Sequence, residues 1–113
     1  MFDIKKRAMM PLAGAARMLM VIEKVKGINN TFERYRKLAE IIPNRKALFE
    51  EAAEAYEVFM RFRALNAFQN NDSGRFIQPK DLNKIERQTL KTAFKSIEDV
   101  QRYLRLRFNL NYM

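Results

Sequence analysis

The sequence of 113 residues contains neither cysteine nor histidine, and only three glycines and three prolines. Without cysteine and histidine the chain has no disulfide, no thiolate nucleophile, no imidazole base and no ordinary zinc or haem site. The scarcity of glycine and proline, together with 48% hydrophobic residues, excludes collagen-like and low-complexity chains. The length suffices for one domain and is too short for two, so we expect a single packed domain over residues 1–113.

Long hydrophobic runs are also absent, since no apolar stretch approaches the roughly 20 residues that span a bilayer. The basic residues 5–7 and the apolar residues 8–16 imitate a secretory signal. However, Arg17 interrupts this run and residues 18–22 resume it, which is typical of a helix that continues to Lys26. We therefore expect a soluble, cytoplasmic protein with no membrane contact.

The spacing of apolar residues predicts helices and no strands. Residues recur at intervals of three and four over 11–26, 30–42, 45–70 and from 83 onward, and no stretch alternates at period two. Gly27 is expected to end the first helix, and Asn30 with Glu33 and Asn83 with Glu86 form candidate capping boxes. The cluster 70–74 predicts a loop between two long helices. The predicted fold is all-α, an antiparallel helical bundle of about four helices with two long ones.

The sequence offers no site for group-transfer chemistry. Nucleotidyl or phosphoryl transfer needs carboxylate ligands for magnesium near a phosphate-binding loop, and the chain has neither a glycine-rich loop nor an Asp-x-Asp or Asp-x-Glu pair. The one acidic cluster, residues 50–57, is interpreted as a solvated helix side. We therefore expect no catalytic residue, no metal site and no cofactor in this chain.

Positive charge is the most prominent feature that is present. There are 22 Lys and Arg residues against 13 Asp and Glu residues, a net charge of +9. Arginines cluster on three predicted helices, at 34–36, 61–63 and 102–107, and would form an anion pocket if they converged. Arg17 lies among Ala15, Ala16, Met18 and Leu19, so its head group is expected near the core with a partner. The chain lacks an aromatic-rich RNA module and a zinc finger, so nucleic-acid binding is not favoured.

Several segments, taken in order, resemble the putative nucleotidyltransferase substrate-binding domain. The resemblance extends from residue 2 to about residue 110 and is carried by residues 2–5, 11–12, 16–17, 30–34, 61–63, 77–79, 82–87, 90–94, Ile97 and Gln101. It implies a helical bundle that packs against a nucleotidyltransferase domain and helps to hold the acceptor substrate. Family members often have a His-Gln pair after the Arg-x-Arg step, and this chain has no histidine.

The resemblance also implies a context. This chain would be the C-terminal domain of a longer bacterial protein, with a catalytic domain related to the uridylyltransferase of the PII signal protein. Regulatory CBS or cyclic-nucleotide-binding modules are expected in the same polypeptide. Magnesium and a nucleoside triphosphate would bind in the catalytic domain, outside this chain.

The predicted substrate-binding residues follow from the resemblance and from the placement of charge. Four arginines are expected to position an anionic group, the acceptor or nucleotide phosphates, and two further residues to flank it: Arg17, Arg34, Arg61 and Arg63, with Lys5 and Gln101. Asp3 and Thr31 also match polar positions of the family. The alternative is a protein–protein interaction or homodimerisation module that links regulatory and catalytic domains, marked by an exposed patch of Met and Phe.

Overall fold

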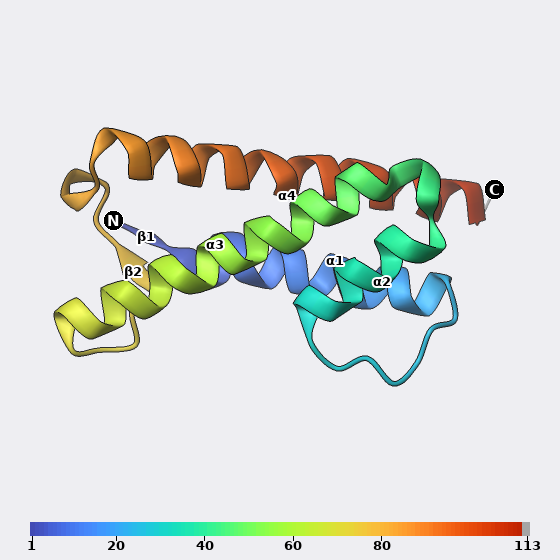
Figure 1. Ribbon diagram of the computed structural model, residues 1–113, viewed down its shortest axis with the longest axis horizontal. Helices are drawn as coiled ribbons and strands as arrows, with labels where there is room; N and C mark the ends of the chain where they lie inside the picture. Colours follow the sequence, from blue (N-terminus) through green and yellow to red (C-terminus); the bar gives the residue numbers. More distant parts are fainter. Residues whose placement is uncertain (112–113) are drawn as a thin grey trace.

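Four α-helices make up most of the structure, a computed structural model that describes the backbone of residues 1–111 and the side chains of residues 1–109 (Figure 1). The helices are α1 (Met10–Ile22), α2 (Thr31–Ile41), α3 (Lys46–Asn70) and α4 (Lys84–Asn111). Two 3-10 turns, η2 (Pro43–Arg45) and η3 (Pro79–Asp81), precede the two long helices. The long helices α3 and α4 run antiparallel, whereas the loop after α1 turns back so that α2 runs alongside α1 in the same direction (Figure 1). The all-α prediction is confirmed.

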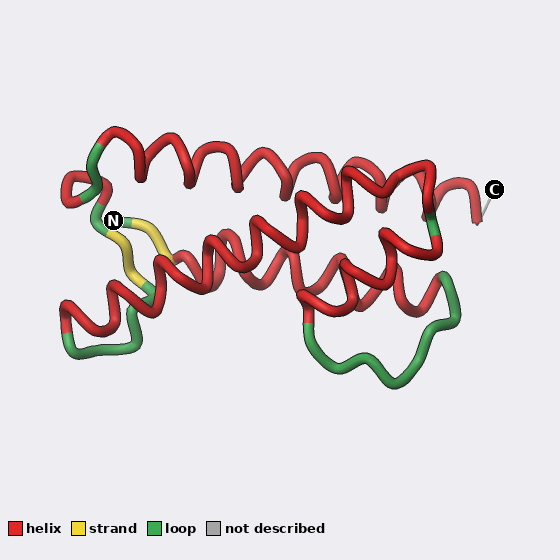
Figure 2. Tube along the Cα trace, in the orientation of Figure 1, coloured by secondary structure: helices red, strands yellow, loops and turns green. Residues whose placement is uncertain are grey.

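The start of the chain forms a short strand that the sequence does not predict. Strand β1 (Phe2–Asp3) pairs antiparallel with β2 (Phe76–Ile77), in the register Phe2 with Ile77 and Asp3 with Phe76 (Figure 2). A π-helical turn, η1 (Lys5–Met9), then leads into α1. The expectation that the chain contains no strand is therefore wrong, because two-residue strands are too short to produce an alternating pattern.

Capping residues explain where two of the four helices, α2 and α4, begin. The Asn30 side chain accepts a hydrogen bond from the Glu33 amide at 2.8 Å. Asn83 and Glu86 form the complete reciprocal capping box, with two hydrogen bonds of 2.8 Å. Both predicted helix starts are confirmed.

The end of α1 differs from the prediction. The helix stops at Ile22 because Lys24 adopts a left-handed conformation, with φ of 58°. The Val25 amide then donates to the Met20 carbonyl at 2.9 Å, which is the bond that closes a Schellman cap. Gly27, with φ of 87°, lies in the following loop and does not end the helix. A lysine in the usual glycine position gives no sequence signal.

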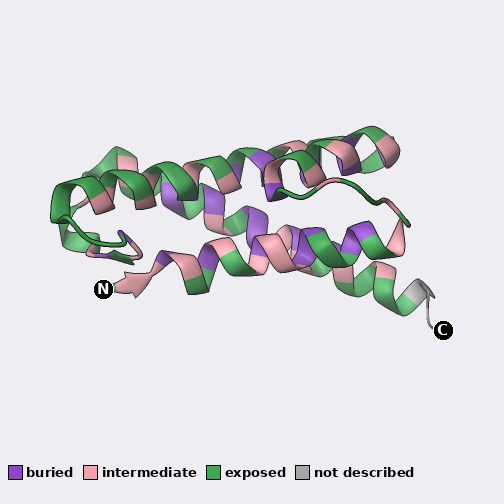
Figure 3. Cartoon of the chain, turned by 90° about the horizontal axis from the view of Figure 1, so that it is seen from below, coloured by how far each residue is buried: buried purple, intermediate pink, exposed green. Residues whose placement is uncertain are grey.

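The hydrophobic core lies between all four helices, with buried residues along their inward sides (Figure 3). Its largest fully buried side chains are Tyr35, Phe49, Phe59, Ile4, Leu12, Leu19, Leu38 and Val100. The Tyr35 hydroxyl donates to the Leu12 carbonyl oxygen at 2.6 Å, which satisfies the one polar atom of this ring. Phe108, which continues the three-and-four spacing of apolar residues along α4 that predicts a buried side, is instead 46% exposed. Among the described helices, none is long and apolar enough to cross a membrane.

Candidate functional site

Two distant parts of the chain meet at the end of the bundle where the chain begins. The β1–β2 pairing and a hydrogen bond of 2.7 Å from the Ile4 amide to the Arg75 carbonyl fasten the first residues to the segment after α3. Ile4 is fully buried beneath this contact. The backbone therefore holds residues near position 3 and near position 75 in a defined arrangement.

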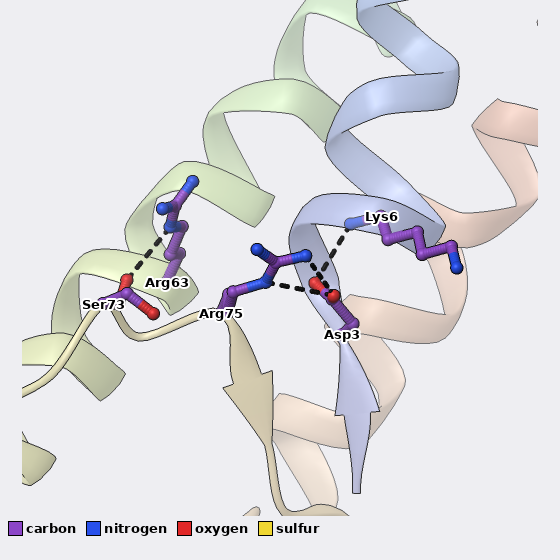
Figure 4. A network of polar contacts seen from close by, with 5 residues as sticks. All are labelled: Asp3, Lys6, Arg63, Ser73 and Arg75. Carbon is purple, nitrogen blue, oxygen red and sulfur yellow. Dashed lines mark hydrogen bonds and ion pairs between the residues drawn. The ribbon is translucent and has the colours of Figure 1, made fainter.

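An ion pair joins these two parts. Arg75 Nε donates to Asp3 Oδ2 at 3.0 Å, and Arg75 Nη2 donates to the same oxygen (Figure 4). The Lys6 amide donates to Asp3 Oδ1 at 3.1 Å, while the Lys6 side chain extends away from the pair. The hydrogen bonds from Arg75 hold the pKa of the Asp3 carboxyl below its ordinary value, and the bond to Asp3 raises the pKa of Arg75. Both groups therefore remain charged at neutral pH.

A second arginine reaches the same loop from α3. Arg63 Nε donates to the carbonyl oxygen of Ser73 at 3.1 Å, two residues before Arg75 (Figure 4). Asn66, one turn further along α3, donates to the carbonyls of Gly74 and Phe76 at 3.0 and 2.8 Å. These bonds hold the loop 71–75 against the last turns of α3.

Gly74 is what allows the loop to lie this close. Its φ of 73° is left-handed, and a Cβ there would lie 2.1 Å from the Arg63 carbonyl oxygen and 2.7 Å from the Ala67 Cβ. Only glycine fits this contact. The close approach holds the loop that leads to Arg75 against the turn of α3 that carries Arg63.

We call the resulting group, Asp3, Arg63, Ser73 and Arg75, the N-terminal basic cluster. It contains two cationic side chains and one carboxylate, and one of its cations, Arg63, is a residue that the sequence predicts as a binding residue. Lys5, also predicted, begins η1 two residues after Asp3. Arg63 uses only Nε on the protein, and Arg75 leaves Nη1 unused, among the residues that the structure describes. Three guanidinium nitrogens are thus left to donate to a ligand. Sequence reasoning missed Arg75.

The other predicted residues lie elsewhere. Arg34 donates from Nε to the Ile28 carbonyl at 2.9 Å and braces the loop before α2. Arg61 is on the opposite side of α3 from Arg63, and its side chain is 71% exposed and 3.9 Å from Glu57. Gln101 is half-buried on α4. Thr31, a further polar position of the resemblance, is buried at the start of α2.

The expectation for Arg17 is wrong. This side chain is exposed on α1, because Ala15, Ala16 and Leu19 supply the buried face and Arg17 projects from the other side. No ion pair involves Arg17 among residues 1–109.

The arginines of α4 form separate contacts at the opposite end of the molecule. Arg107 donates to the Tyr103 hydroxyl at 2.8 Å and forms an ion pair with Glu23, and both bonds raise its pKa. Arg102 lies 3.5 Å from Asp99. The C-terminal part of α4 and the end of α3 lie at opposite ends of the long axis (Figure 1). The three arginine groups therefore do not form one shared pocket.

A groove between α3 and α4 has a volume of 640 Å³. None of the six predicted binding residues lines it. Within the described part of the chain, no group of three or more Asp and Glu side chains is arranged to hold a metal ion. Glu50 and Glu57 in the acidic stretch instead pair with Lys46 at 3.6 Å and with Arg61.

Comparison with known proteins gives one match. Residues 1–108 match the model of a family described as "putative nucleotidyltransferase substrate binding domain". No curated protein and no solved structure matches the chain. The match covers nearly all of the described residues, including both halves of the N-terminal basic cluster.

Proposed function

This chain belongs to the family of putative nucleotidyltransferase substrate-binding domains, and from that membership we propose that it holds an anionic substrate for a nucleotidyltransferase domain. The chain itself supplies no catalytic group. Its part is to bind and orient the acceptor or the nucleotide phosphates. Magnesium, the nucleoside triphosphate and the reacting carboxylates would belong to the nucleotidyltransferase domain.

The observation that carries this proposal is the pair of anchored guanidinium groups in the N-terminal basic cluster. Arg63 is held through Ser73 at 3.1 Å and Arg75 through Asp3 at 3.0 Å, so neither side chain has to be ordered when a ligand binds. Their unused nitrogens donate in the planar geometry that suits phosphate and carboxylate. Lys5, which begins η1 two residues after Asp3, stays a candidate for ligand contact.

The remaining predicted residues take other roles in this proposal. Arg17, exposed on α1, would contact the nucleotidyltransferase domain. Arg34 instead holds the loop before α2 through its hydrogen bond to the Ile28 carbonyl oxygen. Arg61 and Gln101 stay candidates for ligand contact only if the ligand extends beyond the N-terminal basic cluster. We also propose that CBS or cyclic-nucleotide-binding modules, where the full protein has them, act through the nucleotidyltransferase domain.

The test measures anion binding to single variants. Inorganic phosphate, pyrophosphate and a nucleoside triphosphate are titrated into the wild-type chain and into Arg63→Gln by isothermal calorimetry at low salt, because screening weakens exposed charges. Arg63→Gln removes the charged guanidinium donors of this residue, so the dissociation constant for the anion should rise about tenfold. Arg102→Gln is the matched control, since Arg102 is 72% exposed at the far end of the molecule and carries the same charge.

Two outcomes contradict the proposal. Equal affinities for wild type, Arg63→Gln and Arg102→Gln would remove the N-terminal basic cluster from the binding site. A loss for Arg61→Gln as large as that for Arg63→Gln would place the site on the other side of α3 or show that only total charge matters.

A further inference from the structure

Helix α1 is apolar on its outer side as well as on the side that it buries. Arg17 is the only charged residue in α1, and the helix contains no other polar side chain. Three of its four exposed positions are apolar, Met10, Met18 and Val21, the last of them 74% exposed. A helix that is apolar all round is normally buried all round. The outer side of α1 therefore lacks the cover that its composition predicts.

Helix α2, which also lies at the surface, has the composition expected there. It buries Tyr35 and Leu38, and its three exposed positions are Glu33, Arg36 and Glu40, all of them charged. The apolar outer side is therefore a property of the α1 sequence and does not follow from a place at the edge of the bundle.

Gly14 lies in the middle of this outer side. Met10, Gly14, Met18 and Val21 follow one another at spacings of four, four and three residues, so they form one stripe along the helix. A Cβ added to Gly14 would have nothing within 4 Å, so no contact within the described chain requires a glycine here. Glycine in the middle of a helix is destabilising compared with alanine. The glycine has a purpose if a second backbone packs closely against α1 at this point.

The charges next to the stripe are all positive. Lys6 and Arg7 are exposed on η1 and Arg17 is exposed on α1, and none of the three forms an ion pair among residues 1–109. The chain has no carboxylate between Asp3 and Glu23, and both of these already pair with arginines elsewhere in the fold. A surface that covers the stripe would therefore have to supply carboxylates of its own.

We propose that the outer face of α1, defined by Met10, Gly14, Arg17, Met18 and Val21, binds an acidic amphipathic helix of a partner domain. The partner helix packs an apolar stripe on the two methionines and Val21 and crosses α1 at Gly14, where the two axes approach to about 8 Å. It places carboxylates opposite Arg17. That this helix belongs to the nucleotidyltransferase domain rests on the proposed function.

Two other occupants fit the same observations less well. An anionic lipid surface would attract the positive charges, but a helix that lies in a membrane surface gains from large apolar side chains, and a central glycine contributes none. A second copy that packed α1 against α1 would bring two sets of unpaired cations together, since residues 4–22 contain no carboxylate. Gly14 and the charges together favour a helix of opposite charge.

Peptide binding to the chain of 113 residues tests the proposal. The probe is a synthetic helix of about 20 residues, with leucine along one side, alanine at the point that crosses Gly14, and glutamate along both flanks. The control peptide has lysine in place of each glutamate. Isothermal calorimetry should detect binding of the glutamate peptide only, because only that peptide can pair with Arg17.

Two variants separate docking from the stability of the fold. Gly14→Gln fills the crossing point with a residue that favours helix, so the dissociation constant for the glutamate peptide should rise at least tenfold while the Tm rises by about 3 °C. Arg17→Glu should also raise the dissociation constant at least tenfold. The matched control is Arg102→Glu, the same charge change at an arginine that is 72% exposed on α4, and it should leave peptide binding unchanged.

Several results overturn the proposal. They are a wild type that does not bind the glutamate peptide, equal binding of both peptides, full binding by Gly14→Gln, and equal losses for Arg17→Glu and Arg102→Glu. Sedimentation of the chain with phosphatidylglycerol vesicles, and of the chain alone at rising concentration, examines the other occupants. Vesicle binding or self-association that Arg17→Glu abolishes would assign the face to lipid or to a second copy. Phosphate binding by Arg63 is measured separately, so the proposed function and this inference can fail independently.

Discussion

Replacement of Gly74 by alanine tests the close contact on which the N-terminal basic cluster depends. At this position the added Cβ meets the Arg63 carbonyl oxygen at 2.1 Å and the Ala67 backbone nitrogen at 2.7 Å. These are atoms of α3 that no side-chain rotation can move away. In the variant the loop must therefore shift away from the helix. The alanine must in addition adopt a left-handed conformation, which is strained for any residue with a Cβ.

The expected cost follows from what the shift breaks. A left-handed alanine costs about 1 kcal/mol more than glycine. Displacing the loop also weakens the hydrogen bonds to the Ser73, Gly74 and Phe76 carbonyls, each of which contributes about 1 kcal/mol. We expect the free energy of unfolding to fall by about 2–4 kcal/mol, which lowers the Tm by roughly 10 °C.

Gly27→Ala is the matched comparison, because Gly27 has a similar φ of 87° and nothing within 4 Å of its Cβ position. The free energy of unfolding of this variant should fall only by the cost of a left-handed alanine, about 1 kcal/mol. Urea denaturation of both variants measures the difference. If the two substitutions cost the same, steric contact between Gly74 and α3 does not hold the loop, and the geometry of the N-terminal basic cluster would need another explanation.

Two further predictions concern single polar contacts. Tyr35→Phe removes the buried hydroxyl that donates to Leu12 and should cost about 1–2 kcal/mol in urea denaturation, with no change for the exposed Thr92→Val on α4. Because burial raises the pKa of Tyr35, the wild type should also lose stability above about pH 10, where the unfolded chain ionises, and Tyr35→Phe should lose less. Arg75 lowers the pKa of Asp3, so this carboxylate stabilises the fold above the unfolded pKa and the effect disappears as pH falls through the lower folded value. Asp3→Asn should therefore flatten the stability profile below about pH 4 in acid titrations followed by circular dichroism, and an unchanged profile would contradict the ion pair's role.

Much of the fold could be predicted because its signals are local. Asn30 and Asn83 mark helix starts because their own side chains cap the helices, and the loop after Asn70 consists of residues that favour turns. The parts that could not be predicted have no local signal. Two-residue strands show no period, and Lys24 closes α1 in a conformation that lysine rarely adopts.

The candidate site was predicted only in part, for a related reason. Arg63 and Lys5 stand out by charge and by family resemblance, but Arg75 acquires its place from Asp3, 72 residues earlier in the chain. One available signal would have sharpened the prediction. Residues two apart on a helix point about 200° apart, so Arg61 and Arg63 could not both face one ligand.

The loop contact and the proposed binding site should respond to mutation as one unit. Arg63 and Arg75 are placed by main-chain carbonyls and by Asp3, and these anchors all depend on the loop lying against α3. A displaced loop therefore separates the two guanidinium groups even though both charges remain. Gly74→Ala should weaken phosphate binding along with stability, whereas Gly27→Ala should affect stability alone. If binding is unchanged in Gly74→Ala, total charge rather than the arrangement of the two arginines attracts the anion.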